Sequence, residues 1–270
     1  MADSEPISTE PLASGKPSAR LPVTALVPSL ITILGLCFGL FSLKFAVHDR
    51  WKEAVACIIF AAFIDGIDGR VARILNASSK FGAELDSLSD FLNFAVAPAF
   101  ISYVWLTHSI KGVGWGVAIF FIICGAIRLA RFNVSSADKK CDAGPMDEAR
   151  IKVNHFEGMP SPAAGLLCLA PLMTVFFQED RFHKVYYVFN GWQMTLYMFL
   201  IAVMMVSNLP TVSLKGLNIP RRYVSIVMAL FSVAMIALIL EPWIGFPIVG
   251  ACYLLTIPVM SLMAASAEKE

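Results

Sequence analysis

Four aspartates in one short stretch are the residues of this sequence best suited to chemistry. Asp65 and Asp68 are three residues apart, and Asp86 and Asp90 are four residues apart. On helices, both spacings place the two carboxylates of a pair on one face, about one turn apart. Two adjacent antiparallel helices can bring both pairs to one point, where four negative charges repel one another unless cations lie between them. The pattern therefore predicts a site for two hard divalent cations.

Small residues and an arginine accompany these carboxylates. Gly66, Gly69 and Gly82 lie beside them, although glycine inside a helix costs about 1 kcal/mol relative to alanine. Glycine is favoured where a ligand must approach the backbone closely. Arg73 lies about one helical turn beyond Asp68 and can hold a phosphate with its forked guanidinium. Together these residue types favour a diphosphate ligand over a bare ion.

A purely structural interpretation of the same stretch is the alternative. Charges often flank membrane helices, and small residues pack such helices together, which would explain Gly66. It does not explain four aspartates on two helical faces, because carboxylates within a membrane are costly and usually functional. The functional interpretation is therefore preferred.

The composition places this stretch in a membrane protein. The chain has 270 residues, of which 57% are hydrophobic and 15% are charged, with a mean hydropathy of +0.70. Soluble domains contain about 25% charged residues. The net charge of +1 gives no global support for nucleic-acid binding, so no nucleic-acid partner is expected.

The apolar segments predict an all-α, polytopic integral membrane bundle. A spanning helix needs roughly 20 mostly apolar residues. Eight segments meet this requirement, namely residues 25–47, 51–74, 82–106, 113–133, 159–177, 192–208, 223–240 and 245–264. Residues 22–270 are expected to form one membrane domain. Residues 1–21 are rich in Ser, Pro, Glu and Ala and are expected to form a flexible cytoplasmic tail.

The distribution of lysine and arginine predicts the orientation. With the N-terminus in the cytoplasm, most of the 21 Lys and Arg residues lie on the cytoplasmic side, as the positive-inside rule requires. The aspartates then fall at the cytoplasmic ends of the second and third spans. We expect a bacterial plasma (inner) membrane protein whose site faces the cytoplasm, with the endoplasmic reticulum as the other location.

The charged stretch resembles the signature of the CDP-alcohol phosphotransferase family, DxxDGxxAR, eight residues, then GxxxDxxxD. The fixed positions are occupied here by Asp65, Asp68, Gly69, Ala72, Arg73, Gly82, Asp86 and Asp90. Three further segments are similar to the serine-using subgroup of that family, namely ELDSLSDFLNFAVAPA (84–99), IRLARFNV (127–134) and FEGMPSPAAG (156–165). The likeness covers residues 26 to 210, approximately.

The resemblance implies both a fold and a reaction. The fold is a six-helix family core, followed here by two C-terminal helices. The family transfers a phosphatidyl or similar group from a CDP-linked donor to an alcohol and releases CMP, so the substrates would be CDP-diacylglycerol and L-serine. By resemblance, Mg²⁺ or Mn²⁺ is held by Asp65, Asp68, Asp86 and Asp90. Asp90 would also act as general base. The CDP moiety would be bordered by Asp65, Gly69, Ala72, Arg73 and Gly82. The family likeness also implies a homodimer within the lipid bilayer.

The acceptor side of the site is assigned to three residues outside the signature. Asn93 stands where the subgroup usually has serine, and Arg128 and Arg131 are three residues apart at the cytoplasmic end of the fourth span. The two arginines are candidates for binding the serine carboxylate or a donor phosphate. Anchoring of the helix end by positive charge is the alternative for both.

Two other functions remain as alternatives. A sister enzyme would use glycerol 3-phosphate or an inositol compound as acceptor, and the two acceptor-side arginines fit a phosphorylated acceptor as well. A cation transporter would place its carboxylates near the bilayer midplane, often at broken helices in paired repeats. Here the aspartates cluster at one face beside Arg70 and Arg73, and no repeat is visible.

Overall fold

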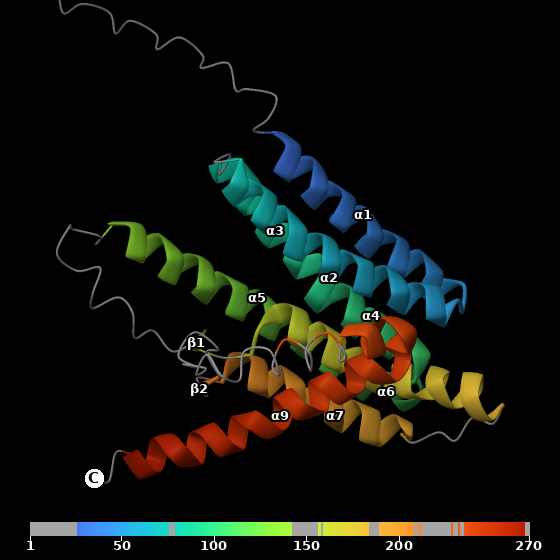
Figure 1. Ribbon diagram of the computed structural model, residues 1–270. Coiled ribbons are helices and arrows are strands. Elements are labelled where there is room, and N and C mark those ends of the chain that lie inside the picture. The colour runs from blue at the N-terminus through green and yellow to red at the C-terminus, as the bar shows by residue number, and fades with distance from the viewer. Residues whose placement is uncertain are drawn as a thin grey trace, which may run out of the picture.

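A computed structural model of the protein describes residues 26–75, 79–141, 156–157, 159–183, 189–207, 210–211, 228, 232 and 235–267. These residues are almost entirely helical, which confirms the predicted all-α membrane bundle (Figure 1). The predicted tail 1–21 and most of the predicted span 223–240 lie outside the described residues.

The helices follow the apolar segments closely. The principal helices are α1 (Val27–Val47), α2 (Trp51–Ile74), α3 (Lys80–Phe91), α4 (Ala97–Trp105), α5 (Lys111–Cys141), α6 (Ser161–Phe182), α7 (Gly191–Val206) and α9 (Pro242–Ala267). A π-helical turn, Leu92–Val96, joins α3 to α4, and a 3-10 turn, Thr107–Ile110, precedes α5. The two-residue strands β1 (Phe156–Glu157) and β2 (Pro210–Thr211) pair antiparallel.

Four of the described helical segments are long and apolar enough to cross a membrane. They are Val27–Val47, Phe81–Trp105, Gly112–Ser135 and Ser161–Phe182. Gly191–Val206 and Pro242–Thr256 are shorter apolar helices. The 24-residue α2 has the length of a span but carries charged residues toward both ends. The charges at its C-terminal end are those of the aspartate stretch.

The helix α5 extends beyond its predicted span. The apolar pattern ends near Asn133, whereas the helix continues to Cys141. The added residues, VSSADKKC, are mostly polar. A helix can continue past the apolar thickness of a membrane because its backbone hydrogen bonds are internal, so hydropathy alone does not mark its end.

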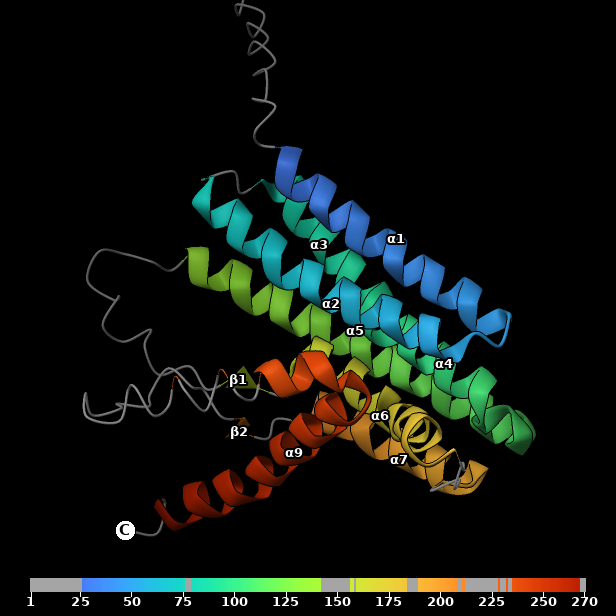
Figure 2. The ribbon, with the colours of Figure 1, turned by 45° about the vertical axis from the view of Figure 1, so that its right-hand side comes forward.

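The helices form two groups that meet at α4 and the π turn. Figures 1 and 2 show α1, α2 and α3 packed together, with α6, α7 and α9 on the other side of the bundle. The buried face of α1 is made of small residues, including Ser29, Thr32, Gly35 and Gly39. A Cβ at Gly35 would lie 3.3 Å from Ile64 Cγ2 of α2, so the two helices approach closely there.

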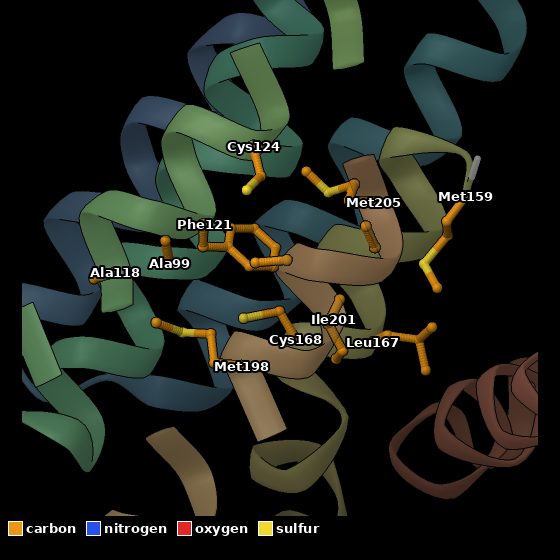
Figure 3. Close-up of a cluster of buried hydrophobic side chains, with 12 residues drawn as sticks. Ala99, Ala118, Phe121, Cys124, Met159, Leu167, Cys168, Met198, Ile201 and Met205 are labelled. Carbon is orange, nitrogen blue, oxygen red and sulfur yellow. The ribbon is translucent and has the colours of Figure 1, made fainter. Parts of the chain in front are cut away.

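An apolar core joins α5, α6 and α7 (Figure 3). Phe121 of α5 is fully buried among side chains such as Cys168 of α6 and Met198 and Ile201 of α7. Helix α9 packs closely on α6. A Cβ at Gly250 of α9 would lie only 2.5 Å from Leu167 Cδ2 of α6. This core fixes the position of α5 relative to the rest of the bundle.

The π turn has a local cause in the sequence. Pro98 has no N–H to donate to the carbonyl of Phe94, and its ring would crowd that carbonyl in a regular helix. The chain instead forms a wider turn in which the N–H of Ala97 donates to Leu92 O, five residues back. The turn begins two residues after Asp90, and π turns frequently occur at functional sites.

Three glycines from three helices surround the π turn. A Cβ at Gly39 of α1 would overlap the side-chain oxygen of Asn93. A Cβ at Gly125 of α5 would lie 2.5 Å from Ala95 Cβ, and one at Gly165 of α6 would lie 2.8 Å from Phe94 O. These close approaches hold the segment that follows the aspartates between α1, α5 and α6.

Candidate active site

The structure brings the four aspartates together. Asp65 and Asp68 lie in the last third of α2, and Asp86 and Asp90 lie in α3. One carboxylate oxygen from each of Asp65, Asp68 and Asp86 lies within 4.8 Å of the others. The charge of Asp90, which lies one turn after Asp86 on α3, interacts with those of Asp65, Asp86 and Asp68. The two helical pairs therefore meet at a single point.

This arrangement needs positive charge. Two carboxylates at such separations repel by about 4 kcal/mol in a protein-like environment. Asp86 Oδ1 and Asp90 Oδ1 are buried and have no hydrogen-bond partner in the described part of the chain. Oxygen ligands on opposite sides of Mg²⁺ or Ca²⁺ are about 4–5 Å apart, as metal–oxygen distances of 2.0–2.6 Å require. The donor set and its spacing thus fit hard divalent cations.

The first helix also contributes to the cluster. Thr32 Oγ1 of α1 donates a hydrogen bond of 2.9 Å to Asp68 Oδ2. Both residues are buried, with exposed fractions of 5% for Thr32 and 4% for Asp68. Asp68 is the most buried of the four aspartates, since the other three are half-buried. One metal-site candidate is therefore held from a helix that carries none of the four carboxylates.

Two glycines leave open space beside the carboxylates. Gly66 and Gly69 are exposed, and a Cβ at either would meet nothing within 4 Å in the described part of the chain. They do not pack the described helices against one another, as the structural interpretation of Gly66 would require. Their backbones are accessible to a ligand next to Asp65 and Asp68.

The other candidates for CDP binding have different surroundings. Arg73 is exposed, and its Nε donates to Gly69 O at 3.0 Å, so its guanidinium lies along the glycine face. Ala72 belongs to the same helix, and its side chain is outside the described part. Gly82 is half-buried at the start of α3, where its N–H donates to Ser79 Oγ at 2.9 Å. A Cβ there would lie 3.3 Å from Ser29 Oγ of α1.

Asn93, the third acceptor-side candidate, is buried against α1. It is 1% exposed, and its Nδ2 donates to Ser89 Oγ at 3.1 Å and to Gly35 O at 3.4 Å. Its Oδ1 is buried without a hydrogen-bond partner among the described residues. These contacts attach the π turn to α1, and they favour a packing role for Asn93 over direct contact with an acceptor.

The two arginines of α5 differ in their surroundings. Arg128 is half-buried, its Nη1 donates to Ser161 Oγ at the start of α6, and its charge interacts with that of Asp90. Arg128 Nε is buried without a hydrogen-bond partner among the described residues. Arg131 is exposed, and its Nη1 donates to Val206 O of α7 at 3.0 Å. Arg128 is thus placed toward Asp90, and the printed contact of Arg131 is with α7.

Sequence reasoning missed several residues of this region. Thr32 contacts Asp68 from a distant part of the chain, and its polar character inside an apolar segment was the available sign. Tyr253 of α9 also interacts electrostatically with Arg128. A residue of the last described helix therefore lies near Arg128.

Comparison with known families agrees with this geometry. A CDP-alcohol phosphatidyltransferase family model matches residues 25–179, which is more than half of the chain and includes all four aspartates. A second model, CDP-alcohol phosphatidyltransferase 2, matches residues 222–258. The chain belongs to the CDP-alcohol phosphatidyltransferase family.

Several similar proteins share one name within this family. A protein of Mycobacterium tuberculosis named CDP-diacylglycerol–serine O-phosphatidyltransferase is 34% identical over 245 residues, which are 90% of this chain and 81% of that protein. A protein of the same name from Helicobacter pylori is 35% identical over 187 residues, 68% of this chain and 70% of its own length. One from Saccharomyces cerevisiae is 37% identical over 181 residues, 59% of this chain and 63% of its own length.

Proposed function

We propose that this protein transfers the phosphatidyl group of CDP-diacylglycerol to the hydroxyl of L-serine, giving phosphatidylserine and CMP. The observation that carries the proposal is the meeting of the carboxylates of Asp65, Asp68 and Asp86, with which the charge of Asp90 interacts, beside the open glycine face of α2. The names of the similar proteins support serine as the acceptor. The diacylglycerol tails would remain in lipid while CDP and serine arrive from water.

The carboxylates have divided roles in this proposal. Asp65, Asp68 and Asp86 would hold divalent cations, Mg²⁺ or Mn²⁺, with Asp90 completing the site. When bound, such cations neutralise the diphosphate and the charge that develops on the leaving group. Gly69, with Ala72, Arg73 and Gly82, would border the CDP moiety. The open face at Gly69 admits the nucleotide close to the helix backbone.

The transfer itself is a displacement at phosphorus. The serine oxygen bonds to the phosphorus that carries the diacylglycerol, and the bond from that phosphorus to the oxygen of CMP breaks. Asp90 accepts the hydroxyl proton, because serine is a poor nucleophile at neutral pH without a base. CMP leaves with the electron pair of the broken bond. Positioning and charge stabilisation carry most of the catalysis in such reactions.

Arg128 is proposed to bind the serine carboxylate, since its charge interacts with that of Asp90 and its buried Nε is engaged by no described residue. Arg128→Gln is expected to raise the KM for serine by about tenfold to a hundredfold, because a hydrogen bond to a charged group contributes about 1.5–3 kcal/mol. The KM for CDP-diacylglycerol should change much less. Steady-state kinetics on both substrates measure the difference.

A matched control for that substitution is Arg50→Gln. Arg50 pairs with the exposed Glu53 at the opposite end of α2, far from the aspartates along that helix. This variant should keep both KM values. An Arg128→Gln enzyme with unchanged serine KM, or with both KM values raised equally, would contradict the assignment. For Arg131, the contact with Val206 favours attachment of α5 to α7.

The acceptor is tested by supplying one alcohol at a time. Purified protein with CDP-diacylglycerol and Mg²⁺ or Mn²⁺ should release CMP with L-serine, and chelation by EDTA should stop the release. No CMP with any alcohol would refute the transferase proposal. Release with glycerol 3-phosphate or an inositol compound, but not with serine, would identify a sister enzyme instead.

The cellular setting follows from the same chemistry. We further propose that residues 22–270 form one membrane domain, that its site faces the cytoplasm of a bacterial plasma membrane, and that the protein is a homodimer. The support is the cytoplasmic supply of CDP-linked substrate and serine, the lysine and arginine distribution, and the family membership.

A further inference from the structure

We propose that Thr32 is a positioning residue for the cation site, which fixes the carboxylate of Asp68 by a hydrogen bond from α1. The inference rests on the proposed cation site between α2 and α3. It assigns a role to a helix that carries none of the four aspartates. Thr32 would not touch the cation or the substrate, and its effect would be transmitted through Asp68.

The geometry of the contact is well defined. Thr32 Oγ1 lies 2.9 Å from Asp68 Oδ2, and both side chains are almost fully buried. The same hydroxyl lies 3.1 Å from Pro28 O, one turn earlier in α1. A hydroxyl has one proton to donate. A carboxylate is the stronger acceptor because its charge strengthens the bond, so Asp68 is the preferred partner of this proton.

The bond restricts Asp68 in a way that favours a cation. A carboxylate that rotates freely presents either oxygen, whereas one whose Oδ2 is held by Thr32 presents the other oxygen in a fixed direction. Residues that hold metal-binding carboxylates by hydrogen bonds commonly change metal affinity or activity by 10–100-fold when they are substituted. The burial of the pair keeps water from replacing the hydroxyl.

The close packing of α1 on α2 makes this contact possible. Gly35, three residues after Thr32, lies against Ile64 of α2, where a Cβ would be 3.3 Å from Ile64 Cγ2. Without a side chain at that position the helices approach closely enough for the short threonine side chain to reach Asp68. The role of α1 is therefore to bring a donor to the least solvent-exposed of the four aspartates.

The test measures cation binding directly. Mn²⁺ is titrated into purified protein without CDP-diacylglycerol, and free Mn²⁺ is followed by electron paramagnetic resonance. Thr32→Val removes the hydroxyl but keeps the shape, and it should weaken Mn²⁺ binding about tenfold or more. Thr32→Ser retains the donor and should bind Mn²⁺ nearly as the unchanged protein does. Excess Mn²⁺ should restore much of the activity of Thr32→Val.

The matched control is Ser42→Ala in the same helix. Ser42 is fully buried, and its hydroxyl donates to Gly39 O at 2.6 Å rather than to a carboxylate. This variant loses a buried hydroxyl of α1 and should keep the Mn²⁺ affinity. If Thr32→Val does not yield folded protein, Thr32→Ala provides the same comparison, with thermal unfolding measured in parallel.

The outcomes separate this inference from the proposed function. Unchanged Mn²⁺ affinity in Thr32→Val, or an equal loss in Thr32→Ser, would overturn the role of the hydroxyl. Loss of thermal stability without loss of Mn²⁺ affinity would show that Thr32 only packs α1 on α2, and would also overturn it. Failure of the unchanged protein to use serine, with Mn²⁺ still bound, would refute the proposed acceptor alone.

Discussion

Asp90→Asn is expected to lower the rate of CMP release by about a hundredfold to ten-thousandfold, the range that a positioned general base contributes. The amide keeps the size of the side chain but cannot accept the serine proton. Asp90 lies two residues before the π turn, and its charge interacts with that of Asp65. Initial-rate assays with CDP-diacylglycerol and serine measure the effect.

Two measurements show whether the Asp90 effect is chemical. Asp65, Asp68 and Asp86 remain in Asp90→Asn, so Mn²⁺ should still bind at the cluster. Asp49→Asn is the control, because Asp49 is exposed in the turn between α1 and α2, where its φ of 57° suits asparagine. Near-normal turnover in Asp90→Asn, or complete loss of Mn²⁺ binding, would remove Asp90 from the role of base.

Gly69→Leu is expected to impair the enzyme without weakening the fold. Leucine has a helix propensity about 1 kcal/mol better than glycine, and a Cβ at Gly69 meets nothing within 4 Å among the described residues. The melting temperature should therefore stay equal or rise. The leucine side chain would occupy the space proposed for CDP, and overpacking of 1–3 kcal/mol corresponds to an affinity loss of roughly 5- to 150-fold.

The control for this substitution is Gly116→Leu. Gly116 is also exposed in a helix, α5, and a Cβ there likewise meets nothing within 4 Å in the described part. It should match Gly69→Leu in thermal stability while retaining the KM for CDP-diacylglycerol. Equal KM values in the two variants would show that the nucleotide does not lie on the Gly69 face.

The meeting of the aspartates was predictable because it depends on short-range spacing. Asp65 with Asp68, and Asp86 with Asp90, share helical faces by their separation alone, and apolar segments placed them on neighbouring helices. The predicted bounds 51–74 match α2 because its charges begin and end the apolar run. The negative charge of four neighbouring aspartates then predicts a bound cation from the sequence alone, without knowledge of the tertiary structure.

The partners of these residues were not predictable in the same way. Thr32 and Asp68 are 36 residues apart, so their hydrogen bond depends on how α1 rotates against α2. Arg128 and Ser161 meet because the core of α5, α6 and α7 sets the register of α5. Asn93 illustrates the reverse case, since its place beside the signature suggested ligand contact while its buried bonds run to α1 and Ser89.

The π turn was detectable but not recognised from sequence. Pro98 within an apolar span indicates that the carbonyl four residues earlier cannot receive the regular hydrogen bond. Whether the helix kinks, breaks or widens at such a position depends on its neighbours. Here the glycines at positions 39, 125 and 165 provide the room for a widened turn.

Because of that widened turn, α4 is rotated about the helix axis relative to a regular continuation of α3, although both helices belong to one membrane crossing. Each residue of an α-helix adds about 100° of rotation, and the extra residue taken up by the π turn shifts the following helix by a comparable amount. Asp86 and Asp90 can thus face the cluster while Ala97 and Ile101 are turned fully into the core. Substitutions that repack the middle of the bundle therefore need not rotate the carboxylates. The half that carries Asp86 and Asp90 and the half that is buried in the core can then change independently in sequence.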